Sequence, residues 1–183
     1  ANVGAITVKV TATDGAAATV SDSFTLTVAN VNDNPTAIAL SATAIDENDA
    51  GAVVGTLTTT DADADDTVTY TLTGDDKDSF EVVNGQLKLK DSVTADYENK
   101  TSYSVTVTAT DSGGASISQA FSVSVNNTND TPTLATAISD QAATEDSAFN
   151  FTIPSGSFFD VDASDTLTYT ATLSDSSALP SWL

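Results

Sequence analysis

Hydrophobic and polar residues alternate with a period of two along most of the chain, in short runs rich in valine, threonine, isoleucine, phenylalanine and tyrosine. In the first run, Ile6, Val8 and Val10 fall on one face of an extended backbone, and Thr7 and Lys9 fall on the other. Each run stops at a cluster of glycine, aspartate or asparagine, which are turn residues. The same alternation predicts strands around residues 24–28, 68–72, 87–89, 103–109, 121–125 and 167–171. Short strands at this spacing predict an all-β, antiparallel sandwich, and no run favours a helix.

The sequence also repeats internally. Residues 10–35 return as residues 107–132, and residues 47–73 return as residues 145–172. Asp111 lies 97 positions after Asp14, which is the length of one immunoglobulin-like sandwich. The repeat therefore predicts tandem seven-stranded Greek-key β-sandwiches in three units: the last strands of one domain (residues 1–31), a complete domain (32–128) and the first half of a third (129–183).

Under this division the two flanking units are parts of domains. Each would expose a core face and unpaired strand edges. Two explanations stay open at this point. The chain is a piece of a longer array, or the flanking units of different copies complete each other head to tail by strand exchange and build a filament.

The charge of the chain is strongly negative. It carries 26 acidic residues against 5 basic ones, for a formal net charge of −21. Nucleic acid is excluded as a partner because a phosphate backbone requires a basic surface, and no apolar run is long enough for membrane insertion. Of the acids, 22 are aspartate and 4 are glutamate, which favours loops over helices. The 40% apolar share and the strand pattern favour a folded protein with bound cations over a disordered acidic chain.

Histidine, cysteine and methionine are all absent. Their absence excludes zinc, copper and iron–sulfur sites, and nucleophiles that depend on histidine or cysteine. A glycosidase with paired carboxylates is the remaining enzymatic alternative, but the sequence implies no cleft for a substrate. We therefore expect a protein that is not an enzyme.

In a β-sandwich the loops gather at two poles, and the repeat assigns the acids to them. The first pole combines the incoming linker with two loops of the complete domain: Asn30, Asn32, Asp33, Asn34, Asp61, Asp63 and Asp111. The second pole combines three loops with the outgoing linker: Glu47, Asp96, Glu98, Asn127, Asn129, Asp130, Asp160 and Asp162. Carboxylates and amide carbonyls that converge from three segments are a ligand set for Ca²⁺, and suit it better than the stricter octahedra of Mg²⁺.

Five of these segments resemble motifs of the cadherin family. Asn32-Asp33-Asn34-Pro35 is similar to the end of the cadherin linker Asp-x-Asn-Asp-Asn-Pro, and Asp61-Ala62-Asp63 is similar to its Asp-x-Asp loop. Asp96-Tyr97-Glu98 resembles the Asp-Arg-Glu or Asp-Tyr-Glu motif, while Glu47 and Asp111 resemble two single acids of each domain. The flanking units resemble the dystroglycan-type cadherin-like variant that recurs in large bacterial surface adhesins with calcium-binding repeat toxin (RTX) type secretion signals.

Three positions depart from the cadherin pattern. Asn30 and Asn127 stand where cadherin linkers usually open with aspartate, and Thr131 replaces the last asparagine of the second linker. The lower charge predicts weaker calcium binding, especially at the second junction.

The resemblance implies a calcium-rigidified extender of an extracellular, cell-surface adhesin, whose partners are calcium ions and neighbouring repeats. A carbohydrate- or protein-binding module is the alternative. Five acids match no motif and are predicted to be solvated loop charge: Asp65, Asp66, Asp75, Asp76 and Asp78. Tyr97 and Trp182 are predicted to pack in a core.

Overall fold

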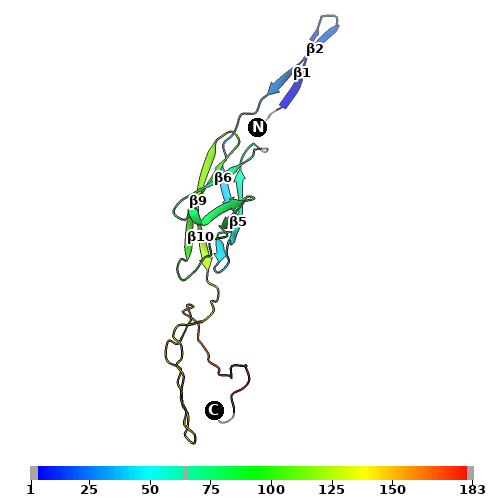
Figure 1. The fold of residues 1–183 in the computed structure, drawn as a ribbon. Coiled ribbons are helices and arrows are strands. Elements are labelled where there is room, and N and C mark those ends of the chain that lie inside the picture. The colour runs from blue at the N-terminus through cyan, green and yellow to red at the C-terminus, as the bar shows by residue number, and fades with distance from the viewer. Residues whose placement is uncertain (1–3, 64–65, 181–183) are drawn as a thin grey trace.

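The computed structural model describes residues 4–63 and 66–180, so the expectations for Asp65 and Trp182 fall outside the described residues. The molecule is extended (Figure 1): a two-stranded hairpin lies at the N-terminal end, a β-sandwich lies in the middle, and a segment of mostly irregular backbone lies at the C-terminal end. In the described part of the chain, no helix has the length and apolar character needed to cross a membrane.

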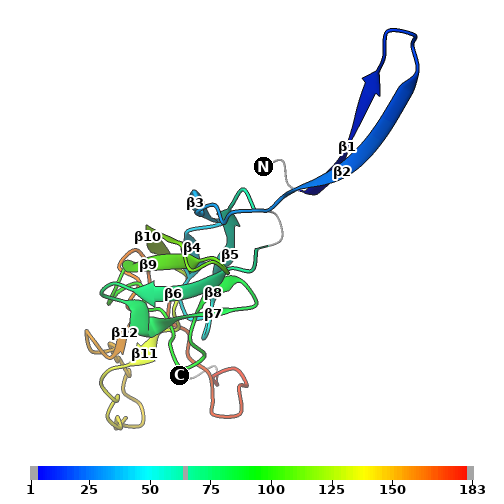
Figure 2. The ribbon, with the colours of Figure 1, turned by 90° about the horizontal axis from the view of Figure 1, so that it is seen from above.

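The N-terminal hairpin pairs β1 (Gly4–Thr13) with β2 (Thr19–Val28) in antiparallel register, from Gly4 opposite Val28 to Thr13 opposite Thr19. It projects away from the sandwich in both Figure 1 and Figure 2. Val8 is half-buried, and every other residue of the two strands is exposed. The hairpin thus has the alternating sequence of a half-buried strand pair, and no described residue covers its apolar face.

The central sandwich spans residues 37–126 and contains two four-stranded sheets. One sheet has the order β4-β10-β9-β6, and the other has the order β3-β5-β8-β7. The strands are β3 (Ala37–Leu40), β4 (Ala44–Asp46), β5 (Val53–Thr60), β6 (Thr69–Thr73), β7 (Phe80–Val83), β8 (Gln86–Leu89), β9 (Ser102–Thr110) and β10 (Ser116–Asn126), with one 3₁₀ turn at Lys77–Ser79. The all-β, immunoglobulin-like prediction is confirmed. The first edge segment is split between the two sheets, as β3 and β4, and counting these as one strand gives the predicted seven.

All strand pairs of the sandwich are antiparallel except β4 with β10, which are parallel. Ser41, Ala42 and Thr43 carry the chain from one sheet to the other between β3 and β4. This crossing places the first and last strands of the sandwich side by side.

The core lies between the two sheets, and it is built from the faces that the alternation predicts. Leu87, Leu89, Val105, Val107 and Val123 are each 0% exposed. The rings of Phe80 and Tyr103 meet edge to face with centroids 5.7 Å apart, a favoured aromatic geometry. Tyr97 is partly buried and packs against this core, as expected for the residue between two polar acids.

The C-terminal segment differs from the prediction. Between residues 129 and 180 it contains only two short paired strands, β11 (Thr133–Leu134) and β12 (Phe158–Phe159), and the predicted strand at residues 167–171 does not form. Its counterpart in the repeat is β6, which takes its backbone hydrogen bonds from β9. No described residue pairs with 167–171 in this way, and an extended segment without a partner leaves its backbone groups unpaired.

Candidate metal centres

The first pole is formed where the incoming linker meets the loop between β5 and β6. The backbone N–H of Asp33 donates to Oδ2 of Asp63 at 2.7 Å, and the Asn30 side-chain amide donates to Oδ1 of the same carboxylate at 2.8 Å. The Asn32 side-chain amide donates to Oδ2 of Asp111 at 3.0 Å. The linker is therefore tied to two separate loops of the sandwich through their carboxylates.

These hydrogen bonds stabilise the ionised form of both acids. The N–H of Asp33, followed by the Asn30 amide, holds the pKa of Asp63 below its ordinary value of 3.8. The Asn32 amide is the main cause that lowers the pKa of Asp111, with further backbone N–H groups in its loop. Both carboxylates are anions at neutral pH.

A third acid joins this pole. Asp61, Asp63 and Asp66 each offer a carboxylate oxygen, and these oxygens all lie within 4.8 Å of one another. The prediction that Asp66 is solvated loop charge is wrong: it is half-buried, and the Ser112 hydroxyl donates to its Oδ1 at 2.7 Å. The Oδ2 atoms of Asp61 and Asp66 are buried without a hydrogen-bond partner.

The second pole is built around Glu47, which is 3% exposed. The N–H of Tyr97 donates to its Oε2 at 2.6 Å, and the N–H of Thr128 donates to its Oε1 at 2.8 Å. The Asn127 amide donates to Oε1 of Glu98 at 2.8 Å. One buried carboxylate thus ties the outgoing linker to the loop that carries the predicted Asp96-Tyr97-Glu98 motif.

Negative charges crowd together at this pole. Glu47, Glu98 and Asp130 offer carboxylate oxygens that lie within 4.8 Å of one another. Burial, and then repulsion from the carboxylates of Glu47, Asp130 and Asp162, raises the pKa of Glu98 above its ordinary value of 4.5. The Asn48 amide donates to Asp130 at 3.0 Å.

A third group of acids follows in the C-terminal segment, and its geometry repeats that of the first pole. The N–H of Asp130 donates to Oδ2 of Asp162 at 2.7 Å, as the N–H of Asp33 does to Asp63. Asp160, Asp162 and Asp165 offer oxygens within 4.8 Å of one another. Asp162 is 6% exposed.

The third acid of each group, Asp66 or Asp165, was missed in the sequence because it lies outside the Asp-x-Asp pair. The internal repeat carried the signal, since Asp165 lies 99 positions after Asp66, as Asp160 does after Asp61.

Three predicted site residues stand apart from these groups. Asp96 is exposed, and its Oδ1 accepts the N–H of Asn99 at 2.9 Å. Asn34 is exposed. The Asn129 amide donates to the carbonyl of Asp130 at 2.6 Å, which shapes the linker.

Asp76 also differs from the solvated charge that the sequence predicts. It is half-buried, and it accepts hydrogen bonds from the Lys100 ammonium and from the N–H of Ser104. Burial alone would raise its pKa, but these two donors outweigh burial and lower it. Asp76 therefore anchors the loop that follows β6.

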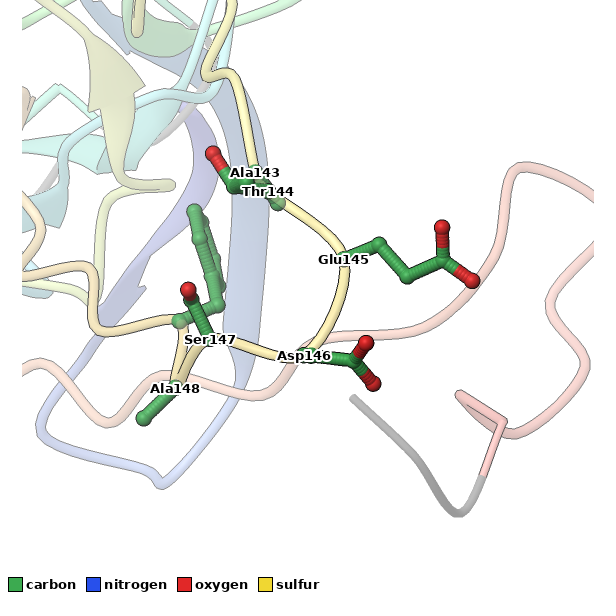
Figure 3. Close-up of a pocket in the computed structure, with 7 residues that line it drawn as sticks. Ala143, Thr144, Glu145, Asp146, Ser147 and Ala148 are labelled. Atoms are coloured by element: carbon green, nitrogen blue, oxygen red, sulfur yellow. The ribbon is translucent and has the colours of Figure 1, made fainter.

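Glu145 corresponds to Glu47 in the internal repeat, and it lies in a different environment. Glu145 lies in the turn Ala143–Phe149, whose hollow is drawn in Figure 3, and Asp146 has φ of 60°, close to the 64° of Asn48. The carboxylates of Glu145 and Asp146 point away from the enclosed side of the turn (Figure 3). The two turns share this positive φ, but Glu145 is exposed whereas Glu47 is buried.

Comparison with known families divides the chain in two. Residues 41–128 match the family described as Cadherin domain, and residues 131–183 match the family described as Putative Ig domain. No curated protein matches the chain.

Solved structures of cadherin repeats are similar in fold. The chain is 25% identical to PcdhgB3 EC1-4, with a TM-score of 0.54 over 67% of this chain and 31% of that one. It is 27% identical to Protocadherin gammaB7 EC3-6, with a TM-score of 0.54 over 70% of this chain and 33% of that one. The chain therefore spans about a third of the length of these structures, and it is cadherin-like in sequence and fold.

Proposed function

We propose that this chain is a calcium-binding extender segment of a large extracellular adhesin, in which calcium stiffens the junctions between successive sandwiches. The observation that carries this proposal is the repeated junction. At both linkers an aspartate N–H is held by the second carboxylate of an Asp-x-Asp loop, and a third acid lies beside that loop. Two junctions built alike favour a repeated structural role over a single catalytic or binding site.

The residues at the poles fit calcium. Their donors are carboxylate and amide oxygens, which Ca²⁺ takes in sets of six to eight. The buried Oδ2 atoms of Asp61 and Asp66 have no hydrogen-bond donor, and a buried polar atom without a partner is costly. A bound cation would satisfy them.

Charge leads to the same conclusion. Glu47, Asp111 and Asp162 are each more than nine-tenths buried. The lysine ion pairs of the described residues involve Asp76, Asp78, Glu81 and Asp91, and none involves an acid of either pole. Buried carboxylates are normally paired or bound to metal.

Calcium would be held at the first pole by the linker, the Asp-x-Asp loop and the loop after β9, and at the second by the corresponding acids. The proposed ligands are Asn30, Asn32, Asp33, Asp61, Asp63, Asp66 and Asp111 at the first pole, and Glu47, Glu98, Asn127, Asp130, Asp160, Asp162 and Asp165 at the second. The ion would supply positive charge that cancels the repulsion between these acids and joins three chain segments. Without it the linkers would bend, and with it the array would stay straight.

We assign the chain to the outside of a cell, at its surface, where it would hold an adhesive part away from the surface. We further propose that the adhesin is bacterial, because the flanking units resemble domains of bacterial adhesins and the sequence contains no arginine or cysteine.

Small-angle X-ray scattering with calcium and with EGTA tests the proposal. We expect the maximum dimension to be smaller, or its distribution broader, in EGTA. The double variant Asp63→Asn/Asp162→Asn should behave in calcium as the parent behaves in EGTA. Asp22→Asn is the matched control, because Asp22 is an exposed acid of β2 outside both poles. If titration calorimetry shows that calcium binds but the scattering profile is identical in both buffers, the stiffening role alone is refuted. The absence of binding would refute the whole proposal.

A further inference from the structure

The central sandwich has four edge strands, and they differ in how well their edges are protected. One sheet ends at β4 and β6 and the other at β3 and β7, and no described strand lies beyond these four. The edge of a sheet presents unpaired backbone N–H and C=O groups that can pair with another strand. Natural sheets protect such edges with charged side chains, proline or short strands.

Three of the four edges carry this protection. β4 has three residues and ends at Asp46, and β7 has four residues and carries Glu81. β3 has four residues and begins two positions after Pro35. β6 is the longest of the four, and the sequence from Thr67 to Gly74 contains no charged residue and no proline, although the chain has a net charge of −21. The edge of β6 is therefore suited to pairing with another strand.

β6 is held firmly in its extended conformation. All five of its residues pair with β9. The Tyr70 hydroxyl lies 2.9 Å from Oγ1 of Thr59 in the facing sheet, and the Thr69 hydroxyl donates to the carbonyl of Thr110 at 3.3 Å. Leu72 packs against the core. A strand that is already ordered loses little conformational entropy when it accepts a partner strand.

The side chains of β6 fit a second copy of the same strand. Thr69, Thr71 and Thr73 are exposed on the outer face of the sheet, while Tyr70 and Leu72 are partly buried on the inner face. In an antiparallel pair of two β6 strands centred on Thr71, position 69 of each copy lies opposite position 73 of the other, and position 70 lies opposite position 72. Threonine pairs are favourable across strands. The two apolar side chains would cover each other, and no like charges would meet within the pair.

We propose that β6 of one copy of this chain pairs antiparallel with β6 of a second copy, which joins two four-stranded sheets into one continuous sheet. The same surface is used on both copies, so the contact closes at a dimer. The strands run between the two poles, and the chain enters at one pole and leaves at the other. The two copies therefore run in opposite directions, as molecules do that project from two facing surfaces.

Charge at the ends of β6 sets the conditions for pairing. The antiparallel pair brings the acids before β6 of one copy, Asp61, Asp63 and Asp66, toward those after β6 of the other, Asp75 and Asp78. These charges repel, and salt screens the repulsion: the Debye length is about 30 Å at about 0.01 M and about 8 Å at about 0.15 M. The dimer should be tighter at the higher salt concentration. Tighter association at the lower one would overturn this arrangement, because it requires opposite charges at the contact.

The first experiment measures the mass of the full chain by sedimentation, in calcium and about 0.15 M salt, over a wide range of concentration. Wild-type protein should change from monomer to dimer and form nothing larger. Thr71→Lys and Thr71→Glu each place two like charges opposite each other at the centre of the pair, so each variant alone should be monomeric. An equal mixture should form dimers again, because opposite charges then face each other. A wild-type chain that stays monomeric at every concentration, or a mixture that fails to associate, would overturn the proposal.

Ser122→Lys is the matched control for these variants. Ser122 is exposed on the same sheet, but it belongs to β10, which is not an edge strand. This variant should dimerise as the wild type does. Circular dichroism spectra of all three variants should match the wild-type spectrum, because both positions are exposed. Loss of the dimer in Ser122→Lys as well would place the contact elsewhere on the sheet and overturn the proposal.

The second experiment tests the register. The chain has no cysteine, so single substitutions give clean crosslinks. Thr71→Cys should form a disulfide-linked homodimer on oxidation, because residues opposite each other in an antiparallel pair lie within disulfide range. Thr69→Cys alone should not, because the two copies of position 69 would lie about 13 Å apart along the pair. Mixed with Thr73→Cys, it should form a heterodimer. Equal yields from Thr69→Cys alone and from the mixture would overturn the proposed register.

Discussion

Two valines at equivalent positions of the repeat give a matched test of how burial controls stability. Val107 of β9 is 0% exposed, and Val10 of β1 is 58% exposed, 97 positions earlier. A valine-to-alanine change removes two carbon groups, each worth about 0.8 kcal/mol when buried, and leaves a cavity besides. We expect Val107→Ala to lower the free energy of unfolding by about 2 to 3 kcal/mol. Val10→Ala should change it by less than about 0.5 kcal/mol in the monomer.

Urea unfolding followed by far-ultraviolet circular dichroism measures both effects, in saturating calcium and at a concentration where sedimentation shows monomers. With a slope of about 2 kcal/mol per molar urea, Val107→Ala should lower the midpoint by about 1 M. A loss below about 0.5 kcal/mol would refute the core assignment of β9. An equal loss in both variants would mean that the face of the hairpin is covered in the isolated chain, contrary to the exposure that we describe.

Three further changes probe the poles and one loop. Glu47→Gln removes one acceptor oxygen from a buried carboxylate. The increase in the urea midpoint that calcium produces should therefore be smaller in the variant than in the parent. An equal increase in both proteins would show that Glu47 is not a calcium ligand. Asp76→Asn should lower the free energy of unfolding by about 1 to 3 kcal/mol at neutral pH, by weakening the hydrogen bond and charge interaction with Lys100. The folded pKa of Asp76 is below 3.8, so its contribution to the free energy of unfolding is present above that pH and is lost as the pH falls through the folded pKa. The difference in free energy of unfolding between variant and parent should therefore narrow in acid. A difference that stays constant with pH would contradict this cause. Gly113→Ala would make a methyl group overlap the side chain of Asn32, which is held at the first pole, and titration calorimetry should show weaker calcium binding. Gly15→Ala is the control, because a methyl group there would enter open space and should leave calcium binding unchanged.

Local patterns were sufficient to predict the central sandwich. Alternation at residues 103–109 and 121–125 identified faces that are buried, because each strand there has both a hydrogen-bonded neighbour and an opposite sheet. The same alternation at residues 167–171 predicted a strand that does not form. Sequence periodicity reports what a segment is suited to, while pairing depends on a partner that can be far away in the sequence or in another molecule.

The poles were predictable in outline but not in detail. Motif spacing and the repeat assigned Asp63 and Asp111 to the same end as the first linker, and the structure brings them to it. The burial of Glu47 by two backbone N–H groups, and the third acids Asp66 and Asp165, depend on how turns fold in three dimensions. A single aspartate in a loop has too many ordinary uses for its spacing alone to reveal such a role.

The parallel pairing of β4 with β10 has a mechanical consequence. The chain enters the central sandwich at one pole and leaves at the other, and β4 and β10 run side by side in the same direction between them. A pulling force applied through the two linkers would make these strands slide along each other. The bonds that resist are loaded together, including Ser124 N–H to the carbonyl of Thr43 at 2.9 Å and Glu47 N–H to that of Asn126 at 3.2 Å. Part of the resistance of a molecule under tension would therefore come from shear, beside the acid that anchors the outgoing linker.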